Sequence, residues 1–259
     1  MTQNKEEKKN TIIDVVSETI VGTATTAIGF ITTGPLGAIG GALIAPSLTA
    51  TIKDIAKRVL SRNEAARVES TFLHAIDKIR ASLEDGKTPR SDNFWVSEEG
   101  NNSQAQIILE GTLLKSRDEY EEKKLIYYSN FLANIGFNSN ISFEKANTLL
   151  RLIEQLSYRQ LTIIAYLSDG KIVNMETWDI SFKDKPILDV YFDFYSEMTN
   201  LYNLRLLQQS GQGVRLGSAA SKLSTLGQSL SILMELSSMP IEEKNSIERI
   251  INSIQSIAG

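Results

Sequence analysis

Cysteine is absent from the 259 residues, and histidine occurs once, at His74. The first absence excludes disulfides and thiol chemistry and fits a reducing compartment. The second leaves little for a His-based metal site or a Ser-His-Asp triad. A net charge of −4 argues against a chain that binds nucleic acid through bulk charge. No catalytic motif occurs either, so we expect no enzyme, no cofactor, no metal and no nucleic-acid partner.

Charged residues are also missing from a long stretch, residues 19–52, which Glu18 precedes and Lys53 follows. Its length exceeds the roughly 20 residues that a helix needs to cross a bilayer. The stretch is rich in Gly, Ala and Thr, and Pro35 and Pro46 interrupt it. This segment is called the uncharged run below. It is apolar enough to enter a membrane, and its hydrophobicity is low enough for it to stay in water when other parts of a protein cover it.

Two arrangements of residues 11–52 compete. In one, a single tilted helix spans the bilayer with a kink at Pro35. In the other, Thr-Thr-Gly-Pro at 32–35 forms a turn between two helical legs. Lysines precede the run, and Lys53 and Arg58 follow it, so both flanks are basic. Because positive flanks stay on the cytoplasmic side, an even number of crossings is favoured, and the sequence predicts the hairpin.

The predicted legs cover residues 19–33 and 36–52, roughly 22 and 25 Å at 1.5 Å per residue. Both are shorter than the roughly 30 Å hydrocarbon core, so a thinned bilayer, a re-entrant hairpin or an extended first leg is needed. Small residues let helices approach closely, and basic residues attract anionic headgroups. The expected helix-packing positions are Gly22, Gly29, Gly34, Gly37, Gly41 and Ala45, the expected pore-facing positions Thr25, Thr26 and Thr32, and the expected headgroup contacts Lys53, Lys57 and Arg58.

The residues before the run, MTQNKEEKKN, mix acidic and basic side chains, so we expect a retained segment and no signal peptide. After the run, Ser61-x-x-Glu64 is a capping box that begins a helix, and Gly86 is placed to end it. A polar linker follows over 91–102, held to the core by Phe94 and Trp95.

Helical periodicity resumes at Ser103 and predicts one helix to about residue 137, with the mixed charges of 115–124 on a solvated face. Ser142 begins another capped helix. Ser157-x-x-Gln160 repeats the capping box and begins the next, before a turn at 169–170.

Three segments carry a resemblance to a known group of proteins. They are RVESTFLHAIDKIRASLEDGKTPR (67–90), GTLLKSRDEYEEKKLIYYSNFLANIGF (111–137) and ISFEKANTLLRLIEQLSYRQLTIIAYL (141–167). Together these segments resemble a family of uncharacterised bacterial helical proteins over about residues 60–167, whereas the uncharged run matches only in character. The resemblance implies a bacterial, cytosol-facing protein and carries over no activity.

The C-terminal part predicts helices over 158–167, 186–208 and 225–237, with a short hairpin over 206–223. This order resembles a winged helix. A DNA-reading helix should carry basic and amide side chains, but the 186–208 helix has three carboxylates against Arg205. A module for packing or protein contacts is therefore favoured over a DNA regulator. A last helix with an isoleucine stripe is expected over 241–257.

The fold class predicted is mainly all-α: an apolar hairpin (1–52), a central helical domain (53–140) and a winged-helix-like C-terminal domain with at most a small β-hairpin (141–259). The function predicted is an oligomerising, membrane-inserting or pore-forming effector of the toxin or antiviral-defence type. It would occupy the bacterial cytoplasm and the cytoplasmic face of the inner membrane, with the lipid bilayer, further copies and a regulatory protein as partners. The alternative is a soluble interaction or sensor protein that keeps the hairpin buried.

Overall fold

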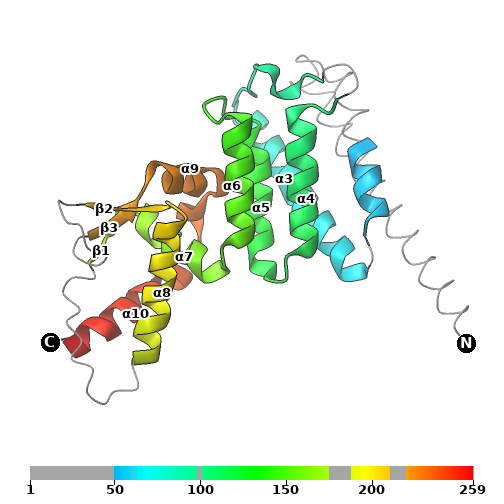
Figure 1. Cartoon of the computed structure of the whole chain (residues 1–259). Helices are drawn as coiled ribbons and strands as arrows, with labels where there is room; N and C mark the ends of the chain where they lie inside the picture. The colour runs from blue at the N-terminus through cyan, green and yellow to red at the C-terminus, as the bar shows by residue number, and fades with distance from the viewer. Residues whose placement is uncertain (1–49, 60, 98–100, 175–187, 211–219, 259) are drawn as a thin grey trace, which may run out of the picture. The chain divides into compact units, whose positions relative to one another are not determined.

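The computed structural model of the chain describes residues 50–59, 61–97, 101–174, 188–210 and 220–258. They form two compact units, which divide between Gln155 and Leu156. The described part is mainly helical, which confirms the predicted class, and it contains one small antiparallel sheet (Figure 1). The predicted three-part division stays a prediction, because residues 1–49 lie outside the described ranges.

Unit 1 is a bundle of helices. After helical residues 50–57 come α3 (Arg62–Glu84), η2 (Asn93–Trp95), α4 (Gln104–Asp118), η3 (Glu122–Lys124), α5 (Leu125–Ile135) and α6 (Phe143–Gln155). α3 contacts both α5 and α4, and α4 also contacts α6. The core between them is apolar, so burial of side chains rather than helix propensity holds the bundle together.

Serine side chains begin these helices by accepting hydrogen bonds from backbone N–H groups. Ser61 Oγ accepts from the N–H of Glu64 at 3.2 Å, and Ser142 Oγ accepts from that of Lys145 at 3.3 Å. Ser103 and Ser157 each form a complete capping box with the glutamine three residues on. The helix starts predicted at 61, 142 and 157 are therefore confirmed. Gly86, with φ at +78°, follows the end of α3 as expected.

The single helix predicted over residues 103–137 is wrong. α4 ends at Asp118, and a turn and η3 separate it from α5. Glu119 and Lys124, which the sequence assigns to a solvated face, are 7 % and 2 % exposed and form an ion pair. The turn brings both side chains inward, and a pattern of alternating charges does not reveal such a turn.

Unit 2 contains helices and the sheet. Its elements are α7 (Tyr158–Ser168), β1 (Val173–Asn174), α8 (Leu188–Asn203), β2 (Leu207–Ser210), β3 (Ala220–Leu223), α9 (Thr225–Met234), η4 (Leu236–Ser238) and α10 (Ile241–Ala258). α7 is the central helix, in contact with α10, η4, α9 and β3. Residues 160–167 are all buried, as expected for a helix that other elements surround.

The strands are antiparallel in the order β1-β3-β2. Leu207 pairs with Leu223, and Val173 pairs with Ser221. The predicted hairpin is therefore present, and β1 adds a third strand that the sequence pattern did not reveal. The prediction that the helix over 186–208 continues to residue 208 is wrong. α8 ends at Asn203, because Arg205 adopts a positive φ of 58° and the chain turns into β2.

Candidate functional site

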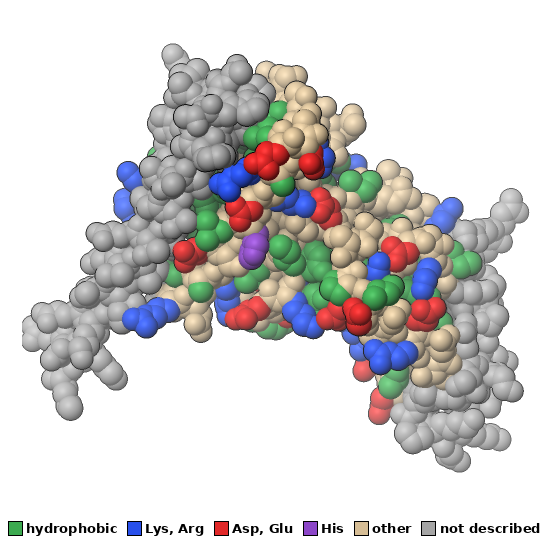
Figure 2. Space-filling model, turned by 180° about the vertical axis from the view of Figure 1, so that it is seen from behind, with side chains coloured by type: hydrophobic (Ala, Val, Ile, Leu, Met, Phe, Trp, Pro, Cys, Tyr) green, Lys and Arg blue, Asp and Glu red, His purple; other side chains and the backbone are tan. Residues whose placement is uncertain are grey.

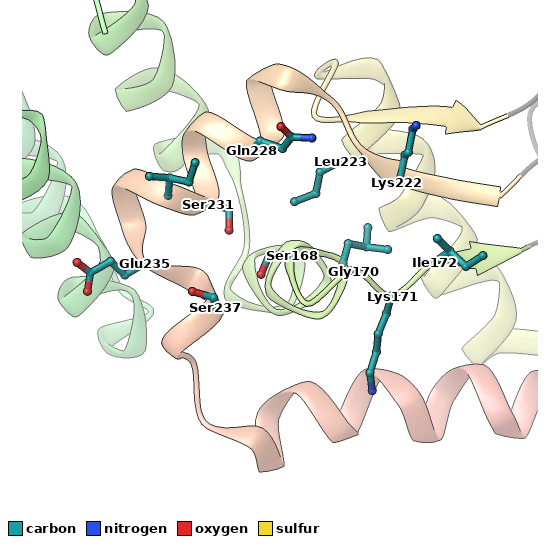
Figure 3. A pocket seen from close by; sticks show the side chains of 12 residues that line it. Ser168, Gly170, Lys171, Ile172, Lys222, Leu223, Gln228, Ser231, Glu235 and Ser237 are labelled. Atoms are coloured by element: carbon teal, nitrogen blue, oxygen red, sulfur yellow. The ribbon is translucent and has the colours of Figure 1, made fainter. Parts of the chain in front are cut away.

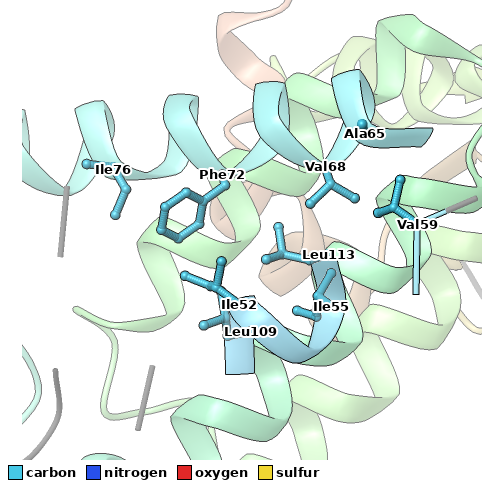
Figure 4. Packing of buried hydrophobic residues seen from close by; sticks show 9 residues of the cluster. All are labelled: Ile52, Ile55, Val59, Ala65, Val68, Phe72, Ile76, Leu109 and Leu113. Atoms are coloured by element: carbon cyan, nitrogen blue, oxygen red, sulfur yellow. The ribbon is translucent and has the colours of Figure 1, made fainter. Parts of the chain in front are cut away.

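The end of the uncharged run is built into the core of unit 1. Ile52, Ile55 and Val59 are at most 2 % exposed, and all three belong to one apolar cluster (Figure 4). The other members come from α3 and α4: Ala65, Val68, Phe72, Ile76, Leu109 and Leu113. We call residues 50–59 the docked segment. It is the place where the run that carries the predicted function meets the helical body.

Polar contacts fasten the same segment to α4. Arg58 Nη1 donates to Glu110 Oε1 at 2.8 Å, and Arg58 also pairs with Asp54. Arg117 Nη1 donates to the backbone oxygen of Arg58 at 3.1 Å. The side chain of Arg58 is 45 % exposed, and such ion pairs contribute about 0–1 kcal/mol each. Three buried aliphatic side chains contribute about 1.5–3 kcal/mol each, so apolar burial dominates the docking.

The three residues predicted to contact headgroups have different surroundings in the structure. Lys53 and Lys57 are exposed on the docked segment, as a contact with lipid requires. Arg58 is exposed as well, but its guanidinium is held by Glu110 and Asp54. The headgroup role stays a prediction for all three residues. Their positions make Lys53 and Lys57 the better placed pair.

Two further arginines take part in the hydrogen bonds next to the docked segment, Arg117 directly and Arg67 through Arg117, and the sequence pattern did not indicate them. Arg67 Nη1 donates to the backbone oxygen of Arg117 at 3.2 Å. Arg117 also forms a two-pronged pair with Asp118, with distances of 2.8 and 2.9 Å. This hydrogen bonding holds the pKa of the Asp118 carboxyl below its usual range and raises that of Arg117. The only sequence signal for these arginines was the alternation of charges, and that pattern does not show which hydrogen-bond partners they have in the fold.

Docking shortens the apolar length available for insertion. Residues 50–52, the end of the predicted second leg, are helical, and Ile52 lies in the core. If that leg begins at residue 36, about 14 residues remain, or roughly 21 Å of helix. This is further below the roughly 30 Å hydrocarbon core than the 36–52 leg. A second leg of the full predicted length therefore requires the docked segment to leave the core.

The remaining predicted positions lie outside the described residues. They are Gly22, Gly29, Gly34, Gly37, Gly41, Ala45, Thr25, Thr26 and Thr32. Within the described ranges, no helix combines the length and the apolar character that a membrane crossing needs.

Within the described residues, the single histidine contacts Ser70 and is not arranged with it as a base and its nucleophile. His74 lies exposed on α3 (Figure 2), with Nδ1 2.8 Å from the backbone oxygen of Ser70 and 3.3 Å from its hydroxyl. A carbonyl oxygen only accepts, so Nδ1 must carry the proton in that hydrogen bond. The nitrogen is then a donor and cannot take a proton from the Ser70 hydroxyl.

A buried ion pair closes the turn between α4 and α5. Lys124 Nζ pairs with Glu119, and the Tyr128 hydroxyl donates to Glu119 Oε2 at 3.4 Å. Burial, followed by the nearby carboxylate of Glu119, raises the pKa of Tyr128. The two buried charges satisfy each other, and the pair joins the end of α4 to the start of α5.

Arg90 fastens the chain between α3 and η2. Its guanidinium is buried, pairs with Asp92 at 2.5 and 2.8 Å, and donates to the backbone oxygen of Ile141 at 3.1 Å. It also lies over the Phe94 ring, 4.3 Å from the centroid. Trp95 Nε1 donates to the backbone oxygen of Arg90 at 2.9 Å. The expectation that Phe94 and Trp95 hold this linker to the core is confirmed.

Unit 2 has a pocket of about 600 Å³ between α7, β3, α9 and η4 (Figure 3). Its wall is mainly apolar, with Leu223 pointing inward. Lys171 turns toward α10, where Nζ donates to Glu248 Oε2 at 3.0 Å. The lining also includes the charged side chains of Lys222 and Glu235, serine hydroxyls, the Gln228 amide and aliphatic side chains. No three His or acidic side chains in the described ranges are grouped to hold a metal.

Comparison with protein-family models, curated proteins and solved structures gives no match for this chain. The resemblance to bacterial helical proteins therefore stays a prediction.

Proposed function

We propose that this chain is a membrane-active helical protein. In this proposal the uncharged run inserts into the bacterial inner membrane as a Gly/Thr-rich hairpin, on oligomerisation, and permeabilises it as a toxin-like or antiviral effector. The observation that supports this most is the docked segment: an uncharged run of 34 residues leads directly into a helix that a folded body holds through Ile52, Ile55 and Val59. A folded body that holds the C-terminal end of such a run is suited to present the run to a membrane.

The contacts of the docked segment also suggest a resting state and an active state. At rest, residues 50–59 lie in the core of unit 1, and the second leg is too short to span. In the active state they leave the core, and residues 50–52 rejoin the second leg, which adds roughly 4.5 Å of helix. Lys53, Lys57 and Arg58 then reach the level of anionic headgroups, each contributing about 1 kcal/mol.

Vesicle flotation and dye release test the proposal. The full chain should float with vesicles of phosphatidylethanolamine and phosphatidylglycerol and release trapped dye. A variant that lacks residues 11–49 keeps the docked segment and should do neither, while circular dichroism shows whether its helices remain. A full chain that stays with the soluble fraction and leaves the vesicles sealed would falsify the proposal.

A pair of substitutions tests the small-residue stripe of the second leg. Gly37→Leu/Gly41→Leu should abolish dye release, because bulky side chains keep the helix backbones apart. Ala38→Leu/Ala42→Leu adds the same side chains at the same spacing one residue along and serves as the matched control. Equal release by the two variants would remove the packing role from Gly37 and Gly41.

The sheet of unit 2 favours a second candidate function, a winged-helix-like module for protein contacts. The order β1-β3-β2, with α8 directly before the β2–β3 hairpin, supports this candidate, because the predicted winged helix places a helix directly before its hairpin. α8 carries Asp189, Asp193 and Glu197 and no basic residue. A phosphate backbone would be repelled by this helix.

Fluorescence anisotropy with duplex DNA distinguishes the module's possible partners. We expect no binding at about 0.15 M salt, where surface charges act over about 8 Å. Binding that weakens steadily as salt rises would instead support the third function considered, a DNA regulator.

A further inference from the structure

One face of α8 is occupied by the core of unit 2, and the helix has a second face. Phe194, Met198 and Leu201 are at most 1 % exposed and recur at helical spacing, so they fix α8 to its unit. Val190 and Phe192 are 39 % and 50 % exposed. The anchoring of α8 therefore does not use these apolar groups.

Aromatic rings near the start of α8 contact one another. The rings of Tyr191 and Tyr195 stack with centroids 6.0 Å apart, and those of Tyr191 and Phe192 meet edge to face at 5.6 Å. Rings that are already held in place lose little conformational entropy when a partner covers them. The aromatic rings are therefore preorganised for contact with a partner.

Carboxylates stand beside the rings. Asp189 and Asp193 are exposed and lie one turn apart, and Phe192 is three residues from Asp189, which makes the two side chains neighbours on a helix. Glu197, further along, lies 3.6 Å from Arg159. Within residues 188–203 there is no Lys or Arg to neutralise the pair of aspartates.

We infer that Asp189, Phe192, Asp193 and Tyr195, here called the α8 face, bind a basic amphipathic helical segment of a partner protein. Cationic side chains of that segment pair with the aspartates and lie over the aromatic rings, and its apolar side chains cover Phe192. The acidic character of the face opposes both a nucleic acid and an anionic lipid surface. The inference is independent of the hairpin and its insertion.

Anisotropy of a labelled peptide tests this in the full chain. The probe is a roughly 18-residue amphipathic helix of Lys and Leu, about five turns, and its matched counterpart has Glu in place of Lys. The full chain should bind the Lys/Leu peptide at least about tenfold more tightly than the Glu/Leu peptide. Equal affinity for the two peptides overturns the inference.

Variants locate the binding. Asp189→Lys/Asp193→Lys and Phe192→Ala should each weaken binding of the Lys/Leu peptide about tenfold or more. Glu84→Lys/Glu242→Lys makes the same change in net charge at two other exposed positions, and Ile232→Ala removes an exposed aliphatic side chain from α9. Both controls should bind like the unchanged chain. All substituted positions are exposed, and circular dichroism verifies the fold of each variant.

Two further results would contradict the inference. If Glu84→Lys/Glu242→Lys weakens peptide binding as much as Asp189→Lys/Asp193→Lys does, the effect comes from net charge alone. Direct binding of labelled duplex DNA by the full chain, weakened by Phe192→Ala, would assign the α8 face to nucleic acid instead.

Discussion

Arg58 and Glu110 join segments that are 52 residues apart in the sequence, through a hydrogen bond of 2.8 Å between Nη1 and Oε1. Arg58 closes the helix that continues from the uncharged run, and Glu110 lies near the middle of α4. The contact marks where the run is held, and it stands at the edge of the buried cluster of Ile52, Ile55 and Val59.

A covalent bridge across this contact should block membrane permeabilisation. Because the chain has no cysteine, Arg58→Cys/Glu110→Cys can be joined by a short bis-methanethiosulfonate without side reactions. The bridged protein should release vesicle dye at least about tenfold more slowly than the same protein after reduction, since the docked segment cannot leave the core. Dye release is followed by fluorescence before and after the reductant.

The matched control bridges a pair that does not involve the docked segment. Lys115 and Glu154 form an exposed ion pair between α4 and α6, so Lys115→Cys/Glu154→Cys is bridged in the same way. This bridge should leave dye release unchanged. If the bridge at 58 and 110 also leaves it unchanged, the docked segment does not need to move.

Removing one member of the buried pair in unit 1 should be costly. Lys124→Met leaves Glu119 buried without its cation and should lower the free energy of unfolding by about 3–5 kcal/mol. The double variant Lys124→Met/Glu119→Met removes both charges and should recover much of that loss. Urea unfolding measures these two variants and Glu119→Met alone, and a double variant that loses the sum of the two single effects would contradict the role of the pair.

The Arg90–Asp92 pair gives unit 1 a predictable dependence on pH. The Arg90 guanidinium, by hydrogen bonding, holds the pKa of the Asp92 carboxyl below its ordinary value of 3.8. A carboxyl whose pKa is lower in the folded state stabilises it above the unfolded-state pKa, and the stabilisation disappears as pH falls through the folded-state pKa.

Asp92→Asn should therefore destabilise the protein at pH 7, and the difference from the unchanged chain should shrink as the pH falls below about 4. Thermal unfolding followed between about pH 3 and 7 measures this, with Asp77→Asn as the control for a largely exposed aspartate. A difference that stays constant over this range would show that the pair does not act through its charge.

Gly227 should not tolerate a side chain. It is buried in the first turn of α9, and a Cβ there would lie 2.2 Å from the backbone oxygen of Leu206. That oxygen accepts the N–H of Ser224, so it cannot move without loss of the bond. Gly227→Ala should lower the free energy of unfolding by about 1–3 kcal/mol.

Gln228→Ala, at the next and exposed position of α9, serves as the control and should change stability by less than about 0.5 kcal/mol. Chemical unfolding measures both variants. Equal stability of the two would show that the close approach to Leu206 can relax.

Local signals predicted much of the helical pattern. Ser157 and Gln160 form the capping box that their spacing indicates, and Gly86 adopts the positive φ expected after a helix. These features depend on residues within one turn of each other, so a short stretch of sequence contains them. The break between α4 and α5 could not be predicted in this way. Glu119 and Lys124 are both common in helices, and the turn is favoured by their burial as an ion pair, which a short stretch of sequence does not show.

The candidate site was predictable only in part. The exposed lysines at 53 and 57 could be proposed from their place after the uncharged run. The docking of Ile52 could not, because a helix rich in small apolar residues has the same pattern in a membrane and against a protein core. Arg67 and Arg117 were missed for a related reason: their carbonyl and carboxylate partners come from turns and distant helices.

The sequence by itself determined that this chain is mainly helical, that it has no thiol chemistry, and that it contains a run long enough and uncharged enough for a bilayer. Composition and short-range spacing carry that information. The tertiary structure decided that the end of the run belongs to the body, and that Phe194, Met198 and Leu201 anchor α8 while Phe192 stays exposed. Those facts depend on which distant segments meet, because burial and ion pairing are set by neighbours in space.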